Sequence, residues 1–191
     1  MIFIVLLTAV ACQPSGQKTL IVAHLCDPQL GFSDFSADSA RFGQEIRQVN
    51  ELSPDAVIIA GDLIHDTGDD RAAATVRKQI AKLKPPVVLT PGNHDIPDPV
   101  TPEGLARYRR LFGNDFHTLE CKGRLIVSAN SQLWREAPAE EAGRNDRLLR
   151  EALQKAKKNG MPVILLTHIP PFVESVDEKD EYFNIPQAKR R

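Results

Sequence analysis

The chain has 191 residues, of which 42% are hydrophobic and 26% are charged, and its formal net charge is −1. This length is enough for one globular domain with a hydrophobic core. Because the charges are balanced and scattered, the sequence argues against a nucleic-acid groove, and we expect no nucleic-acid partner. We interpret the basic end of the chain, residues 189–191, as a solvated helix start.

The chain begins with a predominantly apolar segment of eleven residues, MIFIVLLTAVA, followed directly by Cys12. This run is too short for a membrane span, which needs about 20 residues. An apolar run before a cysteine is typical of a bacterial lipoprotein signal. We therefore predict a signal segment at 1–11, a tether at 12–18 and the domain at 19–191. The protein would be exported, and either anchored through a lipid on Cys12 or periplasmic. Because no Lys or Arg precedes the run, a first strand or a start codon placed late is the alternative, and the protein would then be cytoplasmic.

After residue 18, short apolar runs alternate with amphipathic segments. The apolar runs predict buried strands at 19–26, 55–61, 85–92 and 161–168. Two more strands are expected at 115–120 and 124–129, joined by a turn at Lys122-Gly123. Helices are expected at 38–52, 70–83, 102–112 and 144–159, the third with Thr101 as N-cap and Pro102 at its first position. Continuous apolar strands that alternate with helices indicate an α/β fold, with mainly parallel sheet layers flanked by helices.

Polar side chains follow four of these strands, at the carboxyl ends where parallel sheets bind ligands. They form the segments Asp27–Gln29, Gly61–Asp66, Gly92–Asp95 and Thr167–His168. Each segment alone is more often a turn, a helix cap or a structural histidine than a metal site. Together they supply the hard oxygen ligands, the imidazoles and the bridging carboxylate that a two-metal phosphoesterase needs. The ordered series therefore indicates a dinuclear metal site.

The series D-x-Q, G-D-x-x, G-N-H-D and H resembles the calcineurin-like metallophosphoesterase superfamily, whose usual order is D-x-H, G-D-x-x-D, G-N-H-D/E, H and G-H-x-H. Three segments, DPQLG (27–31), NSQ (130–132) and HIPPFVESVDEKDEYFNI (168–185), are similar to one branch of it. That branch contains the calcineurin-like phosphoesterase-domain-containing proteins, also called complete-S-transactivated-protein-like. The resemblance implies a calcineurin-like α/β sandwich from about residue 19 to the end of the chain.

The resemblance also implies two divalent metal ions, Mn, Fe, Mg or Zn, and assigns their ligands. Asp27 and Gln29 would bind the first ion, and Asp62 would bridge both. Asn93 and His168 would bind the second ion. Because Gln29 replaces the usual histidine with a neutral, harder oxygen, the first site should favour Mg, Mn or Fe over Zn.

The same resemblance makes His94 the residue that holds the phosphate and protonates the leaving oxygen, a task that suits an imidazole near neutral pH. The family usually orients this histidine with an Asp at the fifth position of the Gly61 motif. Here that position is His65, so Asp66, one residue later, is the candidate for this catalytic role.

The final motif of the family, G-H-x-H, does not occur in the 191 residues. Its histidines would give each metal one more ligand. We therefore expect the sequence to be truncated or partial, with a fold that is incomplete at the C-terminus. We also expect its own metal affinity to be weaker than that of a complete relative.

The leading hypothesis is the metal-dependent hydrolysis of a phosphate monoester or diester, in a small molecule or a phosphoprotein. The alternatives are a non-catalytic binding module, an inactive fragment of such an enzyme, and a structural, export-anchored domain. Other residues near the motifs receive ordinary structural roles. We interpret Asp34 as a turn residue, Asp38 as a helix cap, Trp134 as part of a lid and residues 174–181 as a solvated loop.

Overall fold

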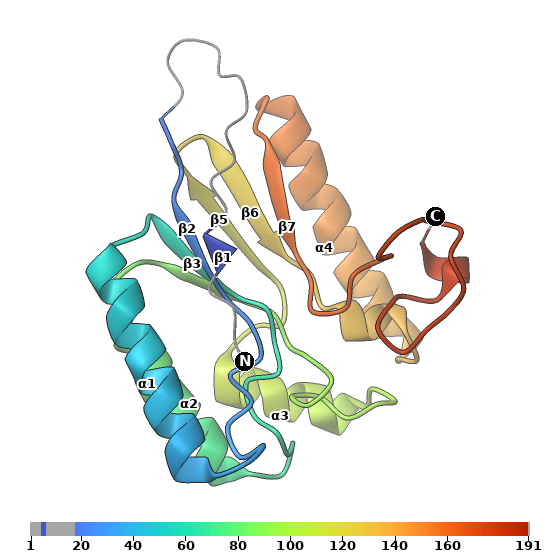
Figure 1. Ribbon diagram of the computed structural model, residues 1–191. Helices are drawn as coiled ribbons and strands as arrows, with labels where there is room; N and C mark the ends of the chain where they lie inside the picture. The colour runs from blue at the N-terminus through green and yellow to red at the C-terminus, as the bar shows by residue number, and fades with distance from the viewer. Residues whose placement is uncertain (1–4, 7–17, 191) are drawn as a thin grey trace.

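The computed structural model describes residues 5–6 and 18–190, which form two β-sheets and the helices around them (Figure 1). The strands are β1 (Val5–Leu6), β2 (Val22–Leu25), β3 (Ala56–Ile59), β4 (Val87–Leu89), β5 (His117–Cys121), β6 (Arg124–Ser128) and β7 (Val163–Leu166). The helices are α1 (Phe35–Leu52), α2 (Asp70–Ile80), α3 (Pro102–Phe112) and α4 (Ala139–Lys158), with short 3-10 helices η1 (Ser131–Trp134) and η2 (Gln187–Lys189). In the described part of the chain, no helix is both long and apolar enough to span a membrane.

The strands divide into a four-stranded sheet in the order β1-β2-β3-β4 and a three-stranded sheet in the order β5-β6-β7. In the first sheet β2, β3 and β4 are parallel, and β1 runs antiparallel to β2. In the second sheet β5 and β6 form an antiparallel hairpin, and β7 is parallel to β6. The hairpin turns at Lys122 and Gly123, which both have positive φ. The predicted α/β sandwich with mainly parallel strands is confirmed.

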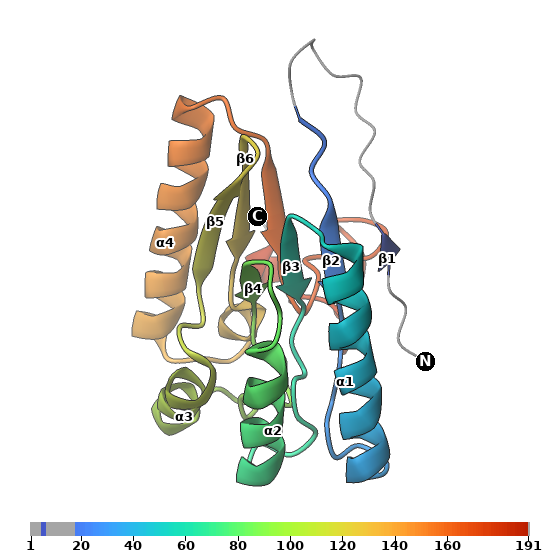
Figure 2. The ribbon, with the colours of Figure 1, turned by 90° about the vertical axis from the view of Figure 1, so that its left-hand side faces the viewer.

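The two sheets pack against each other between layers of helices (Figures 1 and 2). Successive side chains of β3 show the arrangement. Val57 and Ile59 belong to the core beneath α1 and α2, whereas Ile58 packs in a second cluster with Ile126 and Leu166 of the other sheet. A third cluster fills the space between the second sheet and α4. Because both faces of β3 and β4 are covered, the sequences of these two strands are continuous apolar runs.

Helix α1 begins three residues before its predicted start at position 38. Its N-cap is Asp34, whose carboxylate accepts a hydrogen bond from the N–H of Ala37 at 2.8 Å. The interpretation of Asp38 as the cap is therefore wrong. Asp38 is buried in the first turn and accepts hydrogen bonds from the backbone and hydroxyl of Ser33, which hold the preceding loop.

An ion network joins α3 to α4 and to the loop before β5. The guanidinium of Arg109 donates to both carboxylate oxygens of Asp115 at 2.9 and 3.1 Å, and to those of Glu141 at 2.9 and 2.7 Å. Asp115 is buried, and Arg144 and Asn130 also donate to it. Burial acts to raise the pKa of Asp115, but the hydrogen bonds from Arg109 and Asn130 hold it below its usual value.

Replacing Arg109 by alanine is expected to destabilise the fold by about 3 kcal/mol, because the buried Asp115 carboxylate loses its main counter-charge. The network should stabilise the protein near neutral pH and lose this effect as the pH falls below about 4, where Asp115 takes up a proton. Urea unfolding at pH 7 measures the change. Arg110→Ala, at an exposed neighbouring position, is the matched control and should change the free energy of unfolding by less than about 0.5 kcal/mol. Equal effects of the two variants would contradict this account.

Residues 1–4 and 7–17 lie outside the described part of the chain, and they include most of the predicted signal segment and tether. The described part of this region contains β1, whose Val5 and Leu6 pair with His24 and Ala23 of β2. This pairing is what the alternative interpretation expects, in which the apolar run begins as a strand. The signal segment and the tether stay predictions.

The C-terminal loop, residues 170–190, is organised around two charged side chains. The carboxylate of Glu178 accepts hydrogen bonds from the backbone N–H groups of residues 174, 173 and 175, and these bonds lower the pKa of Glu178 to about 2. The side chain of Arg190 is buried and donates to the carbonyl oxygens of Ile185 and Glu178, at 2.6 Å in each case. The interpretation of the basic end as solvated is therefore wrong for Arg190. Residues 174–181 form a loop that the hydrogen bonds of Glu178 hold in order.

Candidate metal centre

The polar segments predicted from the sequence follow the carboxyl ends of β2, β3, β4 and β7 in the structure. The backbone turns sharply at three of the predicted ligands: Asp27, Gln29 and Asp62 have φ of 49°, 42° and 49°. In the described residues, the other non-glycine residues with positive φ are Ser53 and Lys122. This conformation costs on the order of 1 kcal/mol or more for a residue with a Cβ. Its concentration at these strand ends indicates that the turns serve a site rather than the fold alone.

Gly61 and Gly92 allow the turns after β3 and β4 to approach each other closely. Gly61 has a φ of 90°, and a Cβ on it would lie 2.6 Å from the backbone nitrogen of Gly92. A Cβ on Gly92 would lie 2.1 Å from Oδ1 of Asp62 and 2.4 Å from its backbone nitrogen. The Asp62 carboxylate therefore occupies the space that a larger residue at position 92 would need.

Replacing Gly92 by alanine is expected to destabilise the protein by about 2 kcal/mol and to displace the Asp62 carboxylate, because two backbone turns cannot both keep their places. Urea unfolding measures the first effect, and metal titration measures the second. Gly143→Ala is the matched control. It lies within α4, and a Cβ there meets nothing within 4 Å, so it should stabilise the protein by roughly 0.5 kcal/mol. A neutral effect of Gly92→Ala would show that the turns tolerate more separation than the structure implies.

Four of the five predicted metal ligands converge beyond the strand ends: Asp27, Asp62, Asn93 and His168. Nε2 of His168 lies 3.1 Å from Oδ1 of Asn93 and 3.5 Å from Oδ1 of Asp62. Nδ1 of the same ring lies 3.9 Å from Oδ1 of Asp27. One ligand atom from each of Asp27, Asp62 and His168 lies within 4.8 Å of the other two. These residues lie in the loops that follow four different strands, so the fold itself assembles the cluster.

The hydrogen bonding of His168 fits a cation within this cluster. Its Nδ1 lies 2.7 Å from the carbonyl oxygen of Ala60, which can only accept, so Nδ1 carries a proton. In the neutral ring Nε2 then has only a lone pair, and this lone pair faces the carbonyl oxygen of Asn93 and the carboxylate of Asp62. This arrangement is stable with a proton on Nε2, which would then donate to these oxygens, or with a metal cation among the three groups. Carboxylate and amide oxygens with one imidazole are a donor set that suits a divalent metal ion.

The charges at the cluster lead to the same conclusion. Burial raises the pKa of Asp27, and the Asp62 carboxylate adds to the increase, although His168 and His94 oppose it. Two carboxylates this close repel each other, and positive charge beside them offsets that repulsion. A divalent cation would supply that charge.

Gln29, the fifth predicted ligand, is held at the site by its backbone. Its N–H donates to the carbonyl oxygen of Asp62 at 2.8 Å, and the next residue, Leu30, forms an isolated parallel bridge with Ile64. Among the described residues, no hydrogen bond joins the Gln29 side-chain amide to the other predicted ligands. The backbone of Gln29 is therefore bonded to Asp62, whereas its side chain has no hydrogen bond to the cluster in the described part of the chain.

His94 is tied to the site through its backbone and its ring. Its N–H donates to Oδ1 of Asp62 at 3.0 Å, and its Nδ1 lies 2.7 Å from the carbonyl oxygen of His65. Because that carbonyl can only accept, Nδ1 carries a proton and Nε2 is the ring atom left for a substrate. The His94 ring also stacks on the ring of His65, with centroids 4.9 Å apart.

Among the described residues, no hydrogen bond or ion pair joins the Asp66 carboxylate to His94, which it was predicted to orient. Asp66 is exposed and accepts a hydrogen bond from the N–H of Gly68 at 2.8 Å. The carbonyl oxygen of His65 takes the orienting position instead. Sequence reasoning missed this partner because a backbone carbonyl is present at every residue and leaves no signal in the residue types.

Asp95, the last residue of the G-N-H-D segment, links two of the turns. Its buried carboxylate accepts hydrogen bonds from the backbone N–H groups of Leu63 at 2.8 Å, Ile64 at 3.2 Å and Gly92 at 2.8 Å. Burial raises the pKa of Asp95 to about 8, with a smaller increase from Asp62, while these hydrogen bonds oppose the shift. Asp95 therefore fixes the turn after β3 against the turn after β4.

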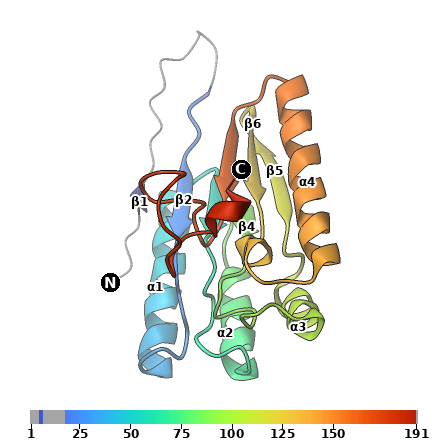
Figure 3. The same cartoon turned by 90° about the vertical axis from the view of Figure 1, so that its right-hand side faces the viewer.

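Two further residues at the site carry no motif signal. The hydroxyl of Tyr182, in the C-terminal loop (Figure 3), lies 3.1 Å from Nδ2 of Asn93. Arg135, just after η1, donates to the backbone carbonyl of Tyr182 at 3.4 Å and lies 3.7 Å from the carboxylate of Asp98. Their positions depend on the conformations of three loops, and the sequence pattern does not predict those conformations.

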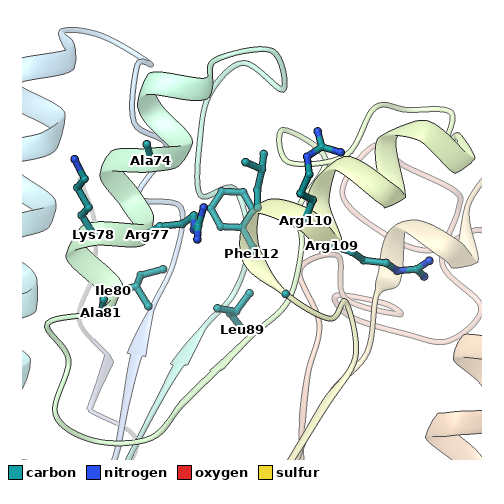
Figure 4. A pocket seen from close by; sticks show the side chains of 11 residues that line it. Ala74, Arg77, Lys78, Ile80, Ala81, Leu89, Arg109, Arg110 and Phe112 are labelled. Carbon is teal, nitrogen blue, oxygen red and sulfur yellow. The ribbon is translucent and has the colours of Figure 1, made fainter.

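Two surface hollows contain none of the predicted site residues. The first, of about 460 Å³, lies along α4, where the indole of Trp134 donates to Asp146 at 2.8 Å, so Trp134 packs against this helix. The second, of about 760 Å³, lies between the last turns of α2 and α3, with Phe112 among its apolar residues and Arg77 and Arg110 among its basic ones (Figure 4). Basic side chains in the last turn of a helix offset its dipole, which explains their presence there.

The chain is similar to known proteins in its sequence and in its fold. A family model described as "Calcineurin-like phosphoesterase" matches residues 23–190. The chain is 32% identical to "Serine/threonine-protein phosphatase CPPED1" of Bos taurus over 167 residues, and 31% identical to the Homo sapiens protein of that name over 166 residues. Each match covers 78% of this chain and 51% of the relative, so the chain spans about half the length of these curated relatives.

Two other matches are more limited. "Glycerophosphodiester phosphodiesterase GpdQ" of Enterobacter lignolyticus is 30% identical over 84 residues, which cover 40% of this chain and 30% of that protein. The solved structure of purple acid phosphatase PPD1 from yellow lupin (Lupinus luteus) seeds has a TM-score of 0.58 and 17% identity. That match covers 81% of this chain and 31% of the lupin chain, and it shows a common fold alone.

Proposed function

Because this chain belongs to the calcineurin-like phosphoesterase family, we propose that it carries out the metal-dependent hydrolysis of a phosphate ester. The superfamily and the branch predicted from the motifs are confirmed by the family match and the CPPED1 relatives. One observation carries the proposal: Nε2 of His168 converges with side-chain oxygens of Asn93 and Asp62, and a second carboxylate, Asp27, lies beside them.

Divalent metal ions are the cofactors of this family. The proposed site would take two of them: Asp27 and Gln29 would hold the first, Asn93 and His168 would hold the second, and Asp62 would serve both. When bound, the ions would neutralise charge on the phosphate oxygens and activate the attacking water. The hard amide oxygen of Gln29 supports Mg, Mn or Fe, rather than Zn, at the first position.

His94 would act from its Nε2 atom. The hydrogen bond to the His65 carbonyl fixes one proton on Nδ1, so the opposite nitrogen is the one that can contact a phosphate oxygen. When the ring carries a second proton, on Nε2, that proton can pass to the leaving oxygen. The hydrogen bond from the backbone N–H of His94 to Asp62 fixes the backbone of His94 beside the cluster. A protonated imidazole there would also attract the negative charge of the substrate.

The proposed substrate is a phosphomonoester, in a phosphoprotein or a small molecule, and the names of the CPPED1 relatives support the phosphoprotein. Turnover of p-nitrophenyl phosphate, bis-p-nitrophenyl phosphate and a phosphoserine peptide, each with Mn²⁺, tests this. We expect both monoesters to be cleaved faster than the diester. Faster cleavage of the diester would contradict the monoester proposal and indicate a phosphodiesterase. Metal binding with no turnover on any ester would favour the non-catalytic alternative.

We also propose that the protein is exported and lipid-anchored at Cys12, which is supported by the apolar run directly before that residue. Mass spectrometry of the protein expressed in a bacterial host tests this: the mature chain should begin at Cys12 and carry a diacylglycerol. Recovery of residues 1–11 still attached would instead support the reading in which they begin the sheet.

A further inference from the structure

We infer that Tyr182 is a positioning residue, whose hydroxyl holds the side-chain amide of Asn93 so that its carbonyl oxygen faces the metal centre. The inference rests on the proposed function for its purpose, but not for the contact itself. Nδ2 of Asn93 lies 3.1 Å from the Tyr182 hydroxyl, while Oδ1 of the same amide lies 3.1 Å from Nε2 of His168. The two ends of one amide thus have different neighbours.

The chemistry of the amide explains why its outer end needs a partner. The last torsion of an asparagine side chain is soft, so the amide plane is set by what its two ends contact. The NH₂ group has two hydrogens, and the Tyr182 hydroxyl takes one of them. The second hydrogen is left for an oxygen of a bound phosphate. Without the hydroxyl, only solvent would hold the outer end.

Tyr182 is positioned for this contact by Arg135 rather than by core packing. Its exposed fraction is 67%, so burial does not hold it in place. Arg135 donates to its carbonyl at 3.4 Å, and the guanidinium lies 5.7 Å from the centre of its ring. The same arginine pairs with Asp98, a few residues beyond Asn93 along the chain. The bonds of Glu178 and Arg190 described above order the loop itself.

The chain provides a matched test, because it contains two tyrosines. Tyr182→Phe removes the hydroxyl and keeps the exposed ring. Tyr108→Phe makes the same chemical change at a buried tyrosine whose hydroxyl has no hydrogen-bond partner among the described residues. The control should therefore leave the site unchanged.

The first measurement needs no metal. In ¹H–¹⁵N spectra of the metal-free protein, the side-chain NH₂ signals of Asn93 are assigned by their loss in Asn93→Asp. They should shift in Tyr182→Phe and stay in place in Tyr108→Phe. If neither variant shifts these signals, the contact does not form and the inference is overturned.

The second measurement is a titration with Mn²⁺. Loss of a residue that orients a metal ligand should weaken Mn²⁺ binding by roughly tenfold in Tyr182→Phe and leave it unchanged in Tyr108→Phe. In turnover assays kcat should fall while KM stays close to its original value. A shifted Asn93 signal with unchanged Mn²⁺ affinity would overturn the positioning role. If the wild-type chain binds no Mn²⁺, the proposed function fails, and the first measurement alone decides on the Tyr182 contact.

Discussion

Replacing Asp62 by asparagine is expected to remove metal binding and turnover together. Oδ1 of Asp62 lies 3.5 Å from Nε2 of His168 and accepts the N–H of His94 at 3.0 Å, so one carboxylate connects the two sides of the proposed site. Asparagine keeps the size of the side chain and one acceptor oxygen, but it removes the negative charge that would attract the cations. The fold should therefore survive while the site fails.

Turnover of Asp62→Asn should fall by at least roughly 100-fold, because loss of a direct ligand exceeds the 10–100-fold effect of losing a ligand's supporting partner. Metal content by elemental analysis and p-nitrophenyl phosphate turnover are the two measurements. Asp34→Asn is the matched control, since asparagine caps a helix as well as aspartate does and Asp34 caps α1. Full metal content and normal turnover in Asp62→Asn would remove Asp62 from the site.

Replacing His94 by alanine should lower turnover and spare the metals. The ring is held at Nδ1 by the carbonyl of His65, and it is not among the acceptor groups that converge around His168. Loss of a general acid lowers kcat by roughly 10²–10⁴-fold. The loss should be smaller for p-nitrophenyl phosphate than for a phosphoserine peptide, because p-nitrophenolate leaves without help from an acid and a serine alkoxide does not.

His117→Ala is the control for this prediction, since the His117 ring contacts the carbonyl of Asn114 at 2.6 Å at the start of β5 and takes no part in the proposed site. Three results would change the assignment of His94. Loss of bound metal would make it a ligand. Equal losses with both esters would make it a phosphate-binding residue rather than an acid. Unchanged turnover would remove it from the reaction.

The sequence predicted the elements best where local chemistry decides them. Helix α3 has its predicted bounds because Thr101 and Pro102 mark its start without ambiguity. The starts of α1 and α4 were misplaced. Asp34 and Asp38 are both acceptable N-caps by residue type, and only the burial of Asp38 under the preceding loop distinguishes them. The first residues of α4 include Glu140 and Glu141, which add no apolar periodicity to mark a helix.

For the site, the sequence indicated the residues whose position follows from the strands. Asp27, Asp62 and Asn93 follow strands of the first sheet, whose parallel register brings them together. His168 follows β7 of the second sheet, which packs against the first. Tyr182 was not predicted, because its position depends on the folding of a loop around the buried Arg190, many residues away from any strand of the first sheet. The residue types likewise do not predict that the His65 carbonyl orients His94, because this role depends on the direction of the backbone.

The most direct test of the central claim, that these acceptor groups form a metal centre, is paramagnetic broadening by Mn²⁺ in ¹H–¹⁵N spectra of the chain, which detects even weak binding. The account predicts that signals of residues 27–31, 61–66, 92–95 and 167–169 disappear first, and that Asp62→Asn abolishes this preference. Broadening spread over exposed acidic segments such as 174–181, unchanged in Asp62→Asn, would show that the strand ends do not bind a divalent cation and would contradict the account.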